Sequence, residues 1–242
     1  MQLIMKTKKT ITILFFLTGC FIVKAQDLET VMSKVINTYT AIDSYSINMN
    51  YTLYSDSISS VKKDELKAEF IKNGENYYMK MKDTEMIFTN YFMIKISHPE
   101  KIILYSKTKI AINDILKSQN PFVEFSNYFN SKKMIDKKNY WECSFSNPKN
   151  NQLPYNKIVL QISKQDFSVL KQIYFFNKSV EKQFNSNAKK GSNERLEIVQ
   201  TSFNDSFIAP DNLFSLKKYL TQINDDKYKA SSYIKDYQIL TQ

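Results

Sequence analysis

The chain has 242 residues and a formal charge of +10, with one histidine, two cysteines and three glycines. This length allows one good-sized domain with a substantial core. A single histidine excludes a histidine-cluster metal centre, and the sequence contains no phosphate-binding glycine loop. Few groups remain for catalysis, so we expect a protein that is not an enzyme and that uses neither a metal nor a cofactor.

The first 25 residues are predicted to be an export signal. Lys6, Lys8 and Lys9 precede an apolar run over 11–23 that is too short to span a bilayer, and a small-residue cleavage zone follows. Because no later segment has about 18 consecutive apolar residues, we expect an exported, periplasmic protein. The signal contains four of the 34 basic residues, which leaves 30 against 24 acidic residues and a net charge of +6.

Two processing sites compete within this segment. Leu17 to Cys20 reads LTGC, which resembles a lipoprotein box and would leave Cys20 as a lipidated N-terminus at the outer membrane. Val23 to Asp27 reads VKAQD, which fits an ordinary signal-peptidase cut after Ala25. The residues after Cys20 are apolar, whereas a lipoprotein tether is usually polar. We therefore favour the cut after Ala25, with lipid attachment at Cys20 as the alternative.

The positive charge is carried almost wholly by lysine, since Arg195 is the only arginine. Lysine is accompanied by many Asn, Ile, Ser, Tyr and Phe residues, which is typical of a protein encoded by an AT-rich genome. Sequence-reading contacts with nucleic acid favour arginine forks, and exported chains rarely meet nucleic acid. We therefore expect no nucleic-acid partner.

The first half of the mature chain is predicted to form one helix followed by a series of strands. Residues 27–42 place their apolar side chains on one helical stripe, with Asp27 as the N-cap. Beyond this helix the apolar period changes to two, which is typical of strands with one buried face. Because short turns such as His98-Pro99 separate the strands, we expect an antiparallel meander. The predicted strands are 46–54, 66–72, 76–82, 85–89, 91–97 and 101–107.

The second half of the chain interrupts this pattern and then resumes it. Residues 109–136 fit short helices better than strands, and 178–194 reads as a polar hairpin loop. Residues 209–220 close the domain. We therefore expect one domain over 26–220, followed by a polar C-terminal tail over 221–242 with one weak strand. Strands are predicted again at 140–145, 156–164, 168–176 and 195–203.

Two single residues could carry chemistry. His98 precedes Pro99, and we interpret it as a surface turn residue and not as a general base. Cys143 shares a strand face with Trp141 and Phe145, so we interpret it as a buried apolar residue and not as a nucleophile. If Cys20 is removed with the signal, no intramolecular disulfide is possible. A hydrolase with two carboxylates far apart in the sequence has no positive signal in its favour.

Large, soft side chains gather on the predicted strands. Five methionines lie there among aromatic residues and isoleucines: Met49, Met79, Met81, Met86 and Met93. Methionine and aromatic side chains suit a surface that accepts variable apolar ligands, because they repack at low cost. They equally fill ordinary cores, and composition alone favours a core.

The order of these segments resembles that of the periplasmic lipoprotein carriers, the LolA-like family, which includes the outer-membrane acceptor LolB. The resemblance covers about 27–220 and is one of pattern. It rests on a helix that runs into a first strand, a meander of strands, an inserted segment and closing strands. These segments are YTAIDSYSINMNY (39–51), the run from EFIKNG to LYSK (69–107), INDILKSQNPFVEFSNYFN (112–130), YNKIVLQISKQDFSVLKQIYFF (155–176) and RLEIVQTSFNDSFIAPDNLFSL (195–216).

The resemblance implies an α+β fold, an antiparallel open β half-barrel with an N-terminal amphipathic helix and an inserted helical lid. It implies a non-enzymatic carrier or receptor that shields lipoprotein acyl chains, or another apolar ligand, in the concave face. Its partners would be lipoproteins or lipids and membrane-bound delivery or acceptor proteins, and the carrier would be a monomer. The alternative is an exported structural or interaction module with a filled core that binds another envelope protein.

The predicted cavity residues follow from the alternation of the strands and from the apolar positions of the inserted segment. They are Ile47, Met49, Tyr51, Leu53, Phe70, Met79, Met81, Ile87, Phe88 and Ile94 on the strands, with Phe122, Phe125 and Phe129 on the lid.

Overall fold

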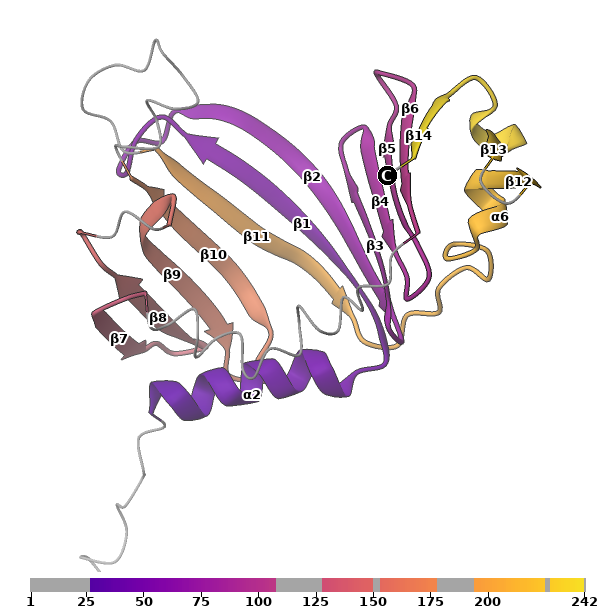
Figure 1. Cartoon of the computed structure of the whole chain (residues 1–242). Helices are drawn as coiled ribbons and strands as arrows, with labels where there is room; N and C mark the ends of the chain where they lie inside the picture. The colour runs from indigo at the N-terminus through magenta and orange to yellow at the C-terminus, as the bar shows by residue number, and fades with distance from the viewer. Residues whose placement is uncertain (1–26, 108–127, 150–152, 178–193, 225–226, 242) are drawn as a thin grey trace, which may run out of the picture.

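The computed structural model describes residues 27–107, 128–149, 153–177, 194–224 and 227–241. Most of these residues belong to one twelve-stranded sheet in the order β14-β6-β5-β4-β3-β2-β1-β11-β10-β9-β8-β7. Neighbouring strands are antiparallel, except that β14 runs parallel to β6. Figure 1 shows an open, curved sheet whose edge strands, β14 and β7, lie far apart. The expected open, mainly antiparallel α+β architecture is thus confirmed.

All ten strands predicted from the period of two are present, with bounds that differ by a few residues. They are β1 (Ser44–Tyr54), β2 (Lys62–Asn73), β3 (Asn76–Met81), β4 (Thr84–Phe88), β5 (Met93–Ser97), β6 (Ile102–Ser106), β8 (Tyr140–Ser146), β9 (Tyr155–Ser163), β10 (Val169–Phe176) and β11 (Arg195–Asn204). The remaining elements are β7 (Ser131–Asp136), β12 (Leu220–Asn224), β13 (Lys227–Ala230), β14 (Gln238–Thr241), α6 (Leu216–Tyr219) and the 3₁₀ helix η1 (Ser232–Ile234).

The predicted N-terminal helix is α2, Leu28–Ala41. Asp27 caps it as expected, because its Oδ1 accepts the backbone N–H of Thr30 at 2.7 Å, and this bond lowers the pKa of the Asp27 carboxyl. Figure 1 shows α2 lying crosswise at one end of the strands. Among the described residues, no helix is long and apolar enough to cross a bilayer.

One hydrophobic core lies between α2 and the β8–β9 end of the sheet. Val31, Met32 and Val35 of α2 are buried there against side chains that all project from one face. We call this the helix face of the sheet, and the other the back face. The buried residues that α2 covers are Phe129, Trp141, Cys143, Phe145, Ile158 and Ile162.

A second core lies on the back face, over β3–β6. Residues that are paired across neighbouring strands project from the same face of the sheet. The successive pairs from β8 to β1 therefore place one residue of each strand on the helix face: Cys143, Leu160, Gln172, Ile198 and Tyr51. The side chains that alternate with this set project from the back face, where the C-terminal segment covers them. The buried residues are Ile71, Tyr78, Ile87, Phe92, Ile94, Ile96, Ile103 and Tyr105, packed against Leu213, Tyr219, Leu220 and Ile234.

The expectation of a polar C-terminal tail is wrong for the described part of 221–242. Leu220–Asn224 pairs with Lys227–Ala230 as β12 and β13, and Gln238–Thr241 adds the edge strand β14 to the main sheet. Ile234 is only 3% exposed. The segment folds because its widely spaced apolar side chains reach the back-face core, a tertiary effect that local pattern does not reveal.

The expected helical insertion is only partly described. Ser131–Asp136 forms the edge strand β7 and not a helix, because it pairs with β8 and places Met134 in the core under α2. Residues 108–127 lie outside the described residues, and so do 178–193, where a hairpin loop was expected.

Candidate ligand-binding face

The helix face carries a continuous apolar surface across β1–β5. Ile47 is paired with Phe70, Phe70 with Met79, and Met79 with Met86, so these side chains share the face. The surface contains all five strand methionines that the sequence singled out. Ile47 is buried, as are Tyr45 and Ala68 on the same face, and the other members are only partly buried. The members of this surface are Ile47, Met49, Tyr51, Leu53, Phe70, Met79, Met81, Met86, Phe88 and Met93.

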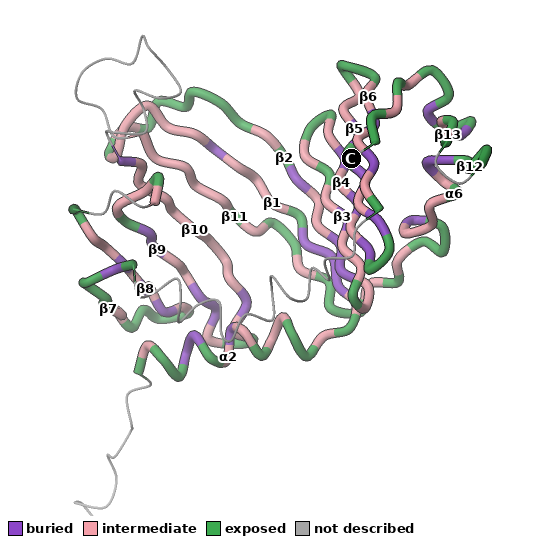
Figure 2. The backbone as a smooth tube through the Cα atoms, viewed as in Figure 1, coloured by how far each residue is buried: buried purple, intermediate pink, exposed green. Residues whose placement is uncertain are grey.

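The burial pattern separates this surface from the two cores. Figure 2 shows that buried positions gather in β3–β6 and beneath α2, whereas β1, β10 and β11 are mostly intermediate. Every residue of β10 is of intermediate burial. Solvent therefore reaches the middle of the sheet on the same face that α2 covers at one end.

A pocket of about 250 Å³ lies on this surface, where the C-terminal end of α2 approaches the sheet. An aromatic row borders it, with Tyr39 and Tyr45 ring centroids 5.8 Å apart, Tyr45 and Phe70 6.0 Å apart, and Phe70 and Tyr77 6.0 Å apart. Edge-to-face and tilted ring pairs stabilise such a row beyond their burial alone. The lining residues are Tyr39, Ile47, Met49, Phe70, Val169, Gln172, Ile198 and Gln200.

Two glutamines give this pocket its polar groups. The Tyr174 hydroxyl donates to Gln172 Oε1 at 2.6 Å, and the Tyr39 hydroxyl accepts the backbone N–H of Val169 at 2.9 Å and lies 3.4 Å from Gln200 Oε1. Burial raises the pKa of Tyr39 and raises that of Tyr174 to about 12, so both hydroxyls keep their protons at neutral pH. The amide NH₂ groups are left as donors beside apolar side chains.

Two of the predicted cavity residues lie on the wrong face. Ile87 and Ile94 are paired on the back face and are 0% exposed in its core. The prediction named both Ile87 and Phe88, although consecutive strand residues project from opposite faces. Phe129 is buried beneath α2 and contacts Phe145, with ring centroids 6.2 Å apart.

The other predicted positions divide between the described and the undescribed parts of the chain. Phe122 and Phe125 lie outside the described residues. The eight that the structure brings together on the helix face are Ile47, Met49, Tyr51, Leu53, Phe70, Met79, Met81 and Phe88.

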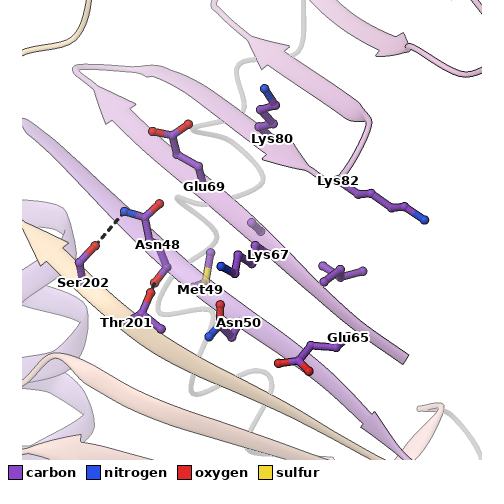
Figure 3. A pocket seen from close by; sticks show the side chains of 12 residues that line it. Asn48, Met49, Asn50, Glu65, Lys67, Glu69, Lys80, Lys82, Thr201 and Ser202 are labelled. Atoms are coloured by element: carbon purple, nitrogen blue, oxygen red, sulfur yellow. Dashed lines mark hydrogen bonds between the residues drawn. The ribbon is translucent and has the colours of Figure 1, made fainter. Parts of the chain in front are cut away.

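The back face of β11, β1, β2 and β3 carries a larger groove of about 720 Å³, most of whose lining residues are polar or charged. Figure 3 shows its asparagine, lysine and glutamate side chains, with Asn48 Nδ2 donating to Ser202 Oγ at 2.8 Å. Acidic and basic side chains alternate along β2 at Glu65, Lys67 and Glu69. We interpret this groove as the solvated side of strands whose other side is apolar.

His98 takes part in a polar cluster that the sequence did not predict. Its Nε2 lies 2.8 Å from Oε1 of Glu85, and its Nδ1 lies 2.8 Å from the Tyr237 hydroxyl. Glu85 is only 2% exposed, and it also accepts from Tyr78 at 3.0 Å and from Tyr233 at 3.3 Å. Burial and the Glu85 carboxylate together raise the pKa of Tyr78.

This cluster fastens the C-terminal segment to β4, and its polar groups bond to one another. His98 lies in a turn, as expected, with its side chain 28% exposed, but its ring nitrogens also contact Glu85 and Tyr237, which the sequence did not indicate. The signal available in the sequence was Glu85, which alternates with Ile87 and so projects from a buried face.

The described residues provide no clear catalytic centre. They contain no group of three or more His, Cys, Asp or Glu side chains that could hold a metal. Cys143 is a free, fully buried thiol whose pKa burial raises to about 12. The interpretation of Cys143 as a buried apolar residue is thus confirmed.

No protein-family model and no curated protein matches the chain. Several solved structures resemble it. An uncharacterized conserved protein from Thermus thermophilus has a TM-score of 0.48 and 10% identity, covering 90% of this chain and 100% of that one. A LolA superfamily protein from Nitrosomonas europaea has a TM-score of 0.34 and 12% identity, covering 79% and 98%. LprF from Mycobacterium bovis has a TM-score of 0.33 and 12% identity, covering 77% and 99%.

Proposed function

We propose that this protein is a non-enzymatic, exported carrier or receptor that binds an acyl chain on the helix face of its sheet. The observation that carries the proposal is the row of partly buried methionine and aromatic side chains across β1–β5. A filled core would bury these side chains as completely as the back-face core buries Ile87 and Ile94. Methionines adapt to chains of different length and shape at low cost.

The size of the pocket indicates how such a ligand would lie. At about 250 Å³ the pocket is smaller than the roughly 300–1,000 Å³ of sites that enclose a whole small molecule. It therefore holds one end of an acyl chain, and the rest lies along the methionine surface. Covering about ten methylenes, at about 0.8 kcal/mol each, gives about 8 kcal/mol before ordering costs. A net gain of about 8 kcal/mol would give a micromolar Kd, so after those costs the expected Kd is weaker than micromolar.

The glutamines suit the carbonyl end of the ligand. Gln172 and Gln200 offer amide donors within the pocket, and each has its own oxygen close to a tyrosine hydroxyl. A neutral ester or amide carbonyl satisfies such donors without bringing a charge into an apolar site. Lipids and lipoproteins, whose acyl chains carry ester or amide carbonyls, are therefore the proposed ligands.

The processing of the N-terminus decides whether the protein acts as a soluble carrier or as a membrane-bound receptor. A cut after Ala25 gives a soluble shuttle, whereas lipid on Cys20 gives a membrane-bound receptor, since an acylated cysteine supplies the two chains that stable anchoring takes. The intact mass of the mature N-terminus distinguishes them.

The experiment compares two neighbouring residues of β3 that project from opposite faces. Met79→Asp places a charge on the helix face, and Lys80→Asp places the same side chain on the exposed back face. Protein purified from the cell envelope is extracted, and the extract is examined for acyl chains by mass spectrometry. We expect acyl chains with the wild type and with Lys80→Asp, and their loss from Met79→Asp.

Circular dichroism and a thermal midpoint confirm that both variants are folded. A wild-type protein that carries no acyl chain, and that takes up no pyrene-labelled acyl probe in solution, would leave the interaction module as the better explanation.

A further inference from the structure

The net charge of the chain is concentrated at one end of the sheet. Residues 131–164, which contain β7, β8 and β9, carry seven lysines against two acidic residues, a net charge of +5. The rest of 26–242 carries 23 basic against 22 acidic residues, a net charge of +1. Lysine is common throughout this protein, but only at this end do acidic residues fail to balance it.

The lysines of this region surround the exposed edge of the sheet. β7 is an edge strand, and register places Lys132 on the helix face, opposite Phe145, and Lys133 on the back face. Two more lysines, Lys137 and Lys138, occupy the turn that joins β7 to β8, and all four are exposed. We call the exposed lysines of residues 131–157 the basic edge. They are Lys132, Lys133, Lys137, Lys138, Lys149 and Lys157.

The carboxylates of the region neutralise little of this charge. Asp136 is paired with Lys164. Within the described part of the chain, Lys133, Lys137 and Lys138 form no ion pair with an acidic side chain. Lys34 of α2 adds a further cation at this end, where its Nζ lies 4.7 Å from the ring centroid of Phe167. The edge therefore presents a positive field to solvent.

We propose that the basic edge docks onto an anionic membrane surface and recognises the phosphates of lipid headgroups. The lysines lie on both faces, along the edge and in the turn, and do not converge on one point. Such a spread of flexible point charges matches a broad layer of negative charge. Arginine forks, which suit specific bidentate contacts, are absent from this region.

Docking by this edge fixes the orientation of the ligand-binding face. β1 lies five strands from β7 in the sheet, and neighbouring strands are about 4.8 Å apart, so β1 lies about 24 Å from the membrane. The methionine surface stays clear of the bilayer and open to a partner that brings or removes the ligand. The positive charge of this edge does not depend on the proposed function, and the proposed function does not require docking.

The test measures binding to vesicles of the processed protein purified from the cell envelope, with Cys20→Ser so that no lipid is attached to that residue, and with the intact mass showing that the apolar export signal has been removed. Vesicles of mixed phosphatidylglycerol and phosphatidylcholine are compared with vesicles of phosphatidylcholine alone, by co-sedimentation at low and high salt. We expect binding to the anionic vesicles only, and loss of that binding at high salt because salt screens exposed charges.

Matched variants locate the surface. Replacing Lys133, Lys137 and Lys138 by serine should weaken binding by about 100-fold, from the contribution of each lysine near an anionic membrane. Replacing the same three by arginine should preserve it. The control replaces Lys227, Lys229 and Lys235 by serine, which are also exposed and lie near the opposite edge strand, β14. It should bind like the wild type.

Thermal midpoints show whether each variant is folded. Absence of binding at low salt, equal binding to neutral vesicles, or equal weakening by the control triple would each overturn the proposal. A basic edge without membrane affinity would then point to an acidic protein partner. None of these results alters the acyl-chain extraction with Met79→Asp, so failure of docking and failure of the proposed function are distinguishable.

Discussion

Ile87 and Phe88 are neighbours in β4, and the structure gives them opposite roles. Ile87 lies in the back-face core, is 0% exposed and is paired with Ile94. Phe88 lies on the helix face, paired with Tyr77 and Met93, and is only partly buried. Truncating each to alanine therefore separates the stabilising face of the sheet from the proposed binding face.

The two truncations should differ in their cost to stability. Ile87→Ala removes three buried carbons, worth about 0.8 kcal/mol each, and leaves a cavity that raises the total to about 3–4 kcal/mol. Phe88→Ala removes a ring that solvent already reaches and leaves no closed cavity, so about 1 kcal/mol is expected. For a domain of this size each kcal/mol lowers the thermal midpoint by about 2–4 °C, giving shifts of about 6–16 °C and about 2–4 °C.

Urea unfolding and titration with a pyrene-labelled acyl chain measure the two effects. Ile87→Ala should lose stability and bind the probe as the wild type does, under conditions where it remains folded. Phe88→Ala should keep most of its stability and bind more weakly. If Phe88→Ala were as destabilising as Ile87→Ala and bound the probe normally, the helix face would be a filled core and the assignment of the two faces would fail.

Two further features give predictions. The Cys143 thiol, whose pKa burial raises to about 12, should resist iodoacetamide in the folded protein and react in urea; equal rates would contradict its burial. The unfolded thiol ionises near pH 8.5, whereas the folded thiol keeps its proton, so the free energy of unfolding should fall as the pH rises above about 8.5. The fall should be less steep in Cys143→Ala. Urea titrations at neutral and alkaline pH measure this difference. Replacing both Tyr233 and Tyr237 by phenylalanine should speed proteolysis of the C-terminal segment about 5–30-fold, because each lost, partly buried hydrogen bond costs up to about 1 kcal/mol. The exposed Tyr91→Phe should leave that rate unchanged.

The regular part of this fold could be predicted because its signal is local. Alternation along 46–54 and its counterparts indicated the strands, and Asp27 indicated the start of α2, since both patterns depend on neighbouring residues. The shared face of Ile47, Met49, Phe70 and Met79 follows from the same alternation once strand pairing is known.

The errors arose where tertiary contacts decide the structure. Ile87 and Phe88 are both apolar, and only the register shows which of them faces α2 and which faces the C-terminal segment. The C-terminal segment itself is polar on average and folds because it packs on β3–β6. The cluster of His98, Glu85 and Tyr237 joins residues up to about 150 positions apart, a distance at which no sequence period operates.

The parallel pairing of β14 with β6 affects the order in which this protein can fold. Gln238 must meet Ile102 across most of the chain, and closing so long a loop is slow. Until then β6 exposes an unpaired edge and the isoleucines of β4–β6 lack their cover, which is a risk for aggregation. A ribosome-bound or partly translocated chain therefore cannot complete the back-face core. Because the back-face core is completed only after export, a chaperone that shields β6 would directly affect the yield of folded protein.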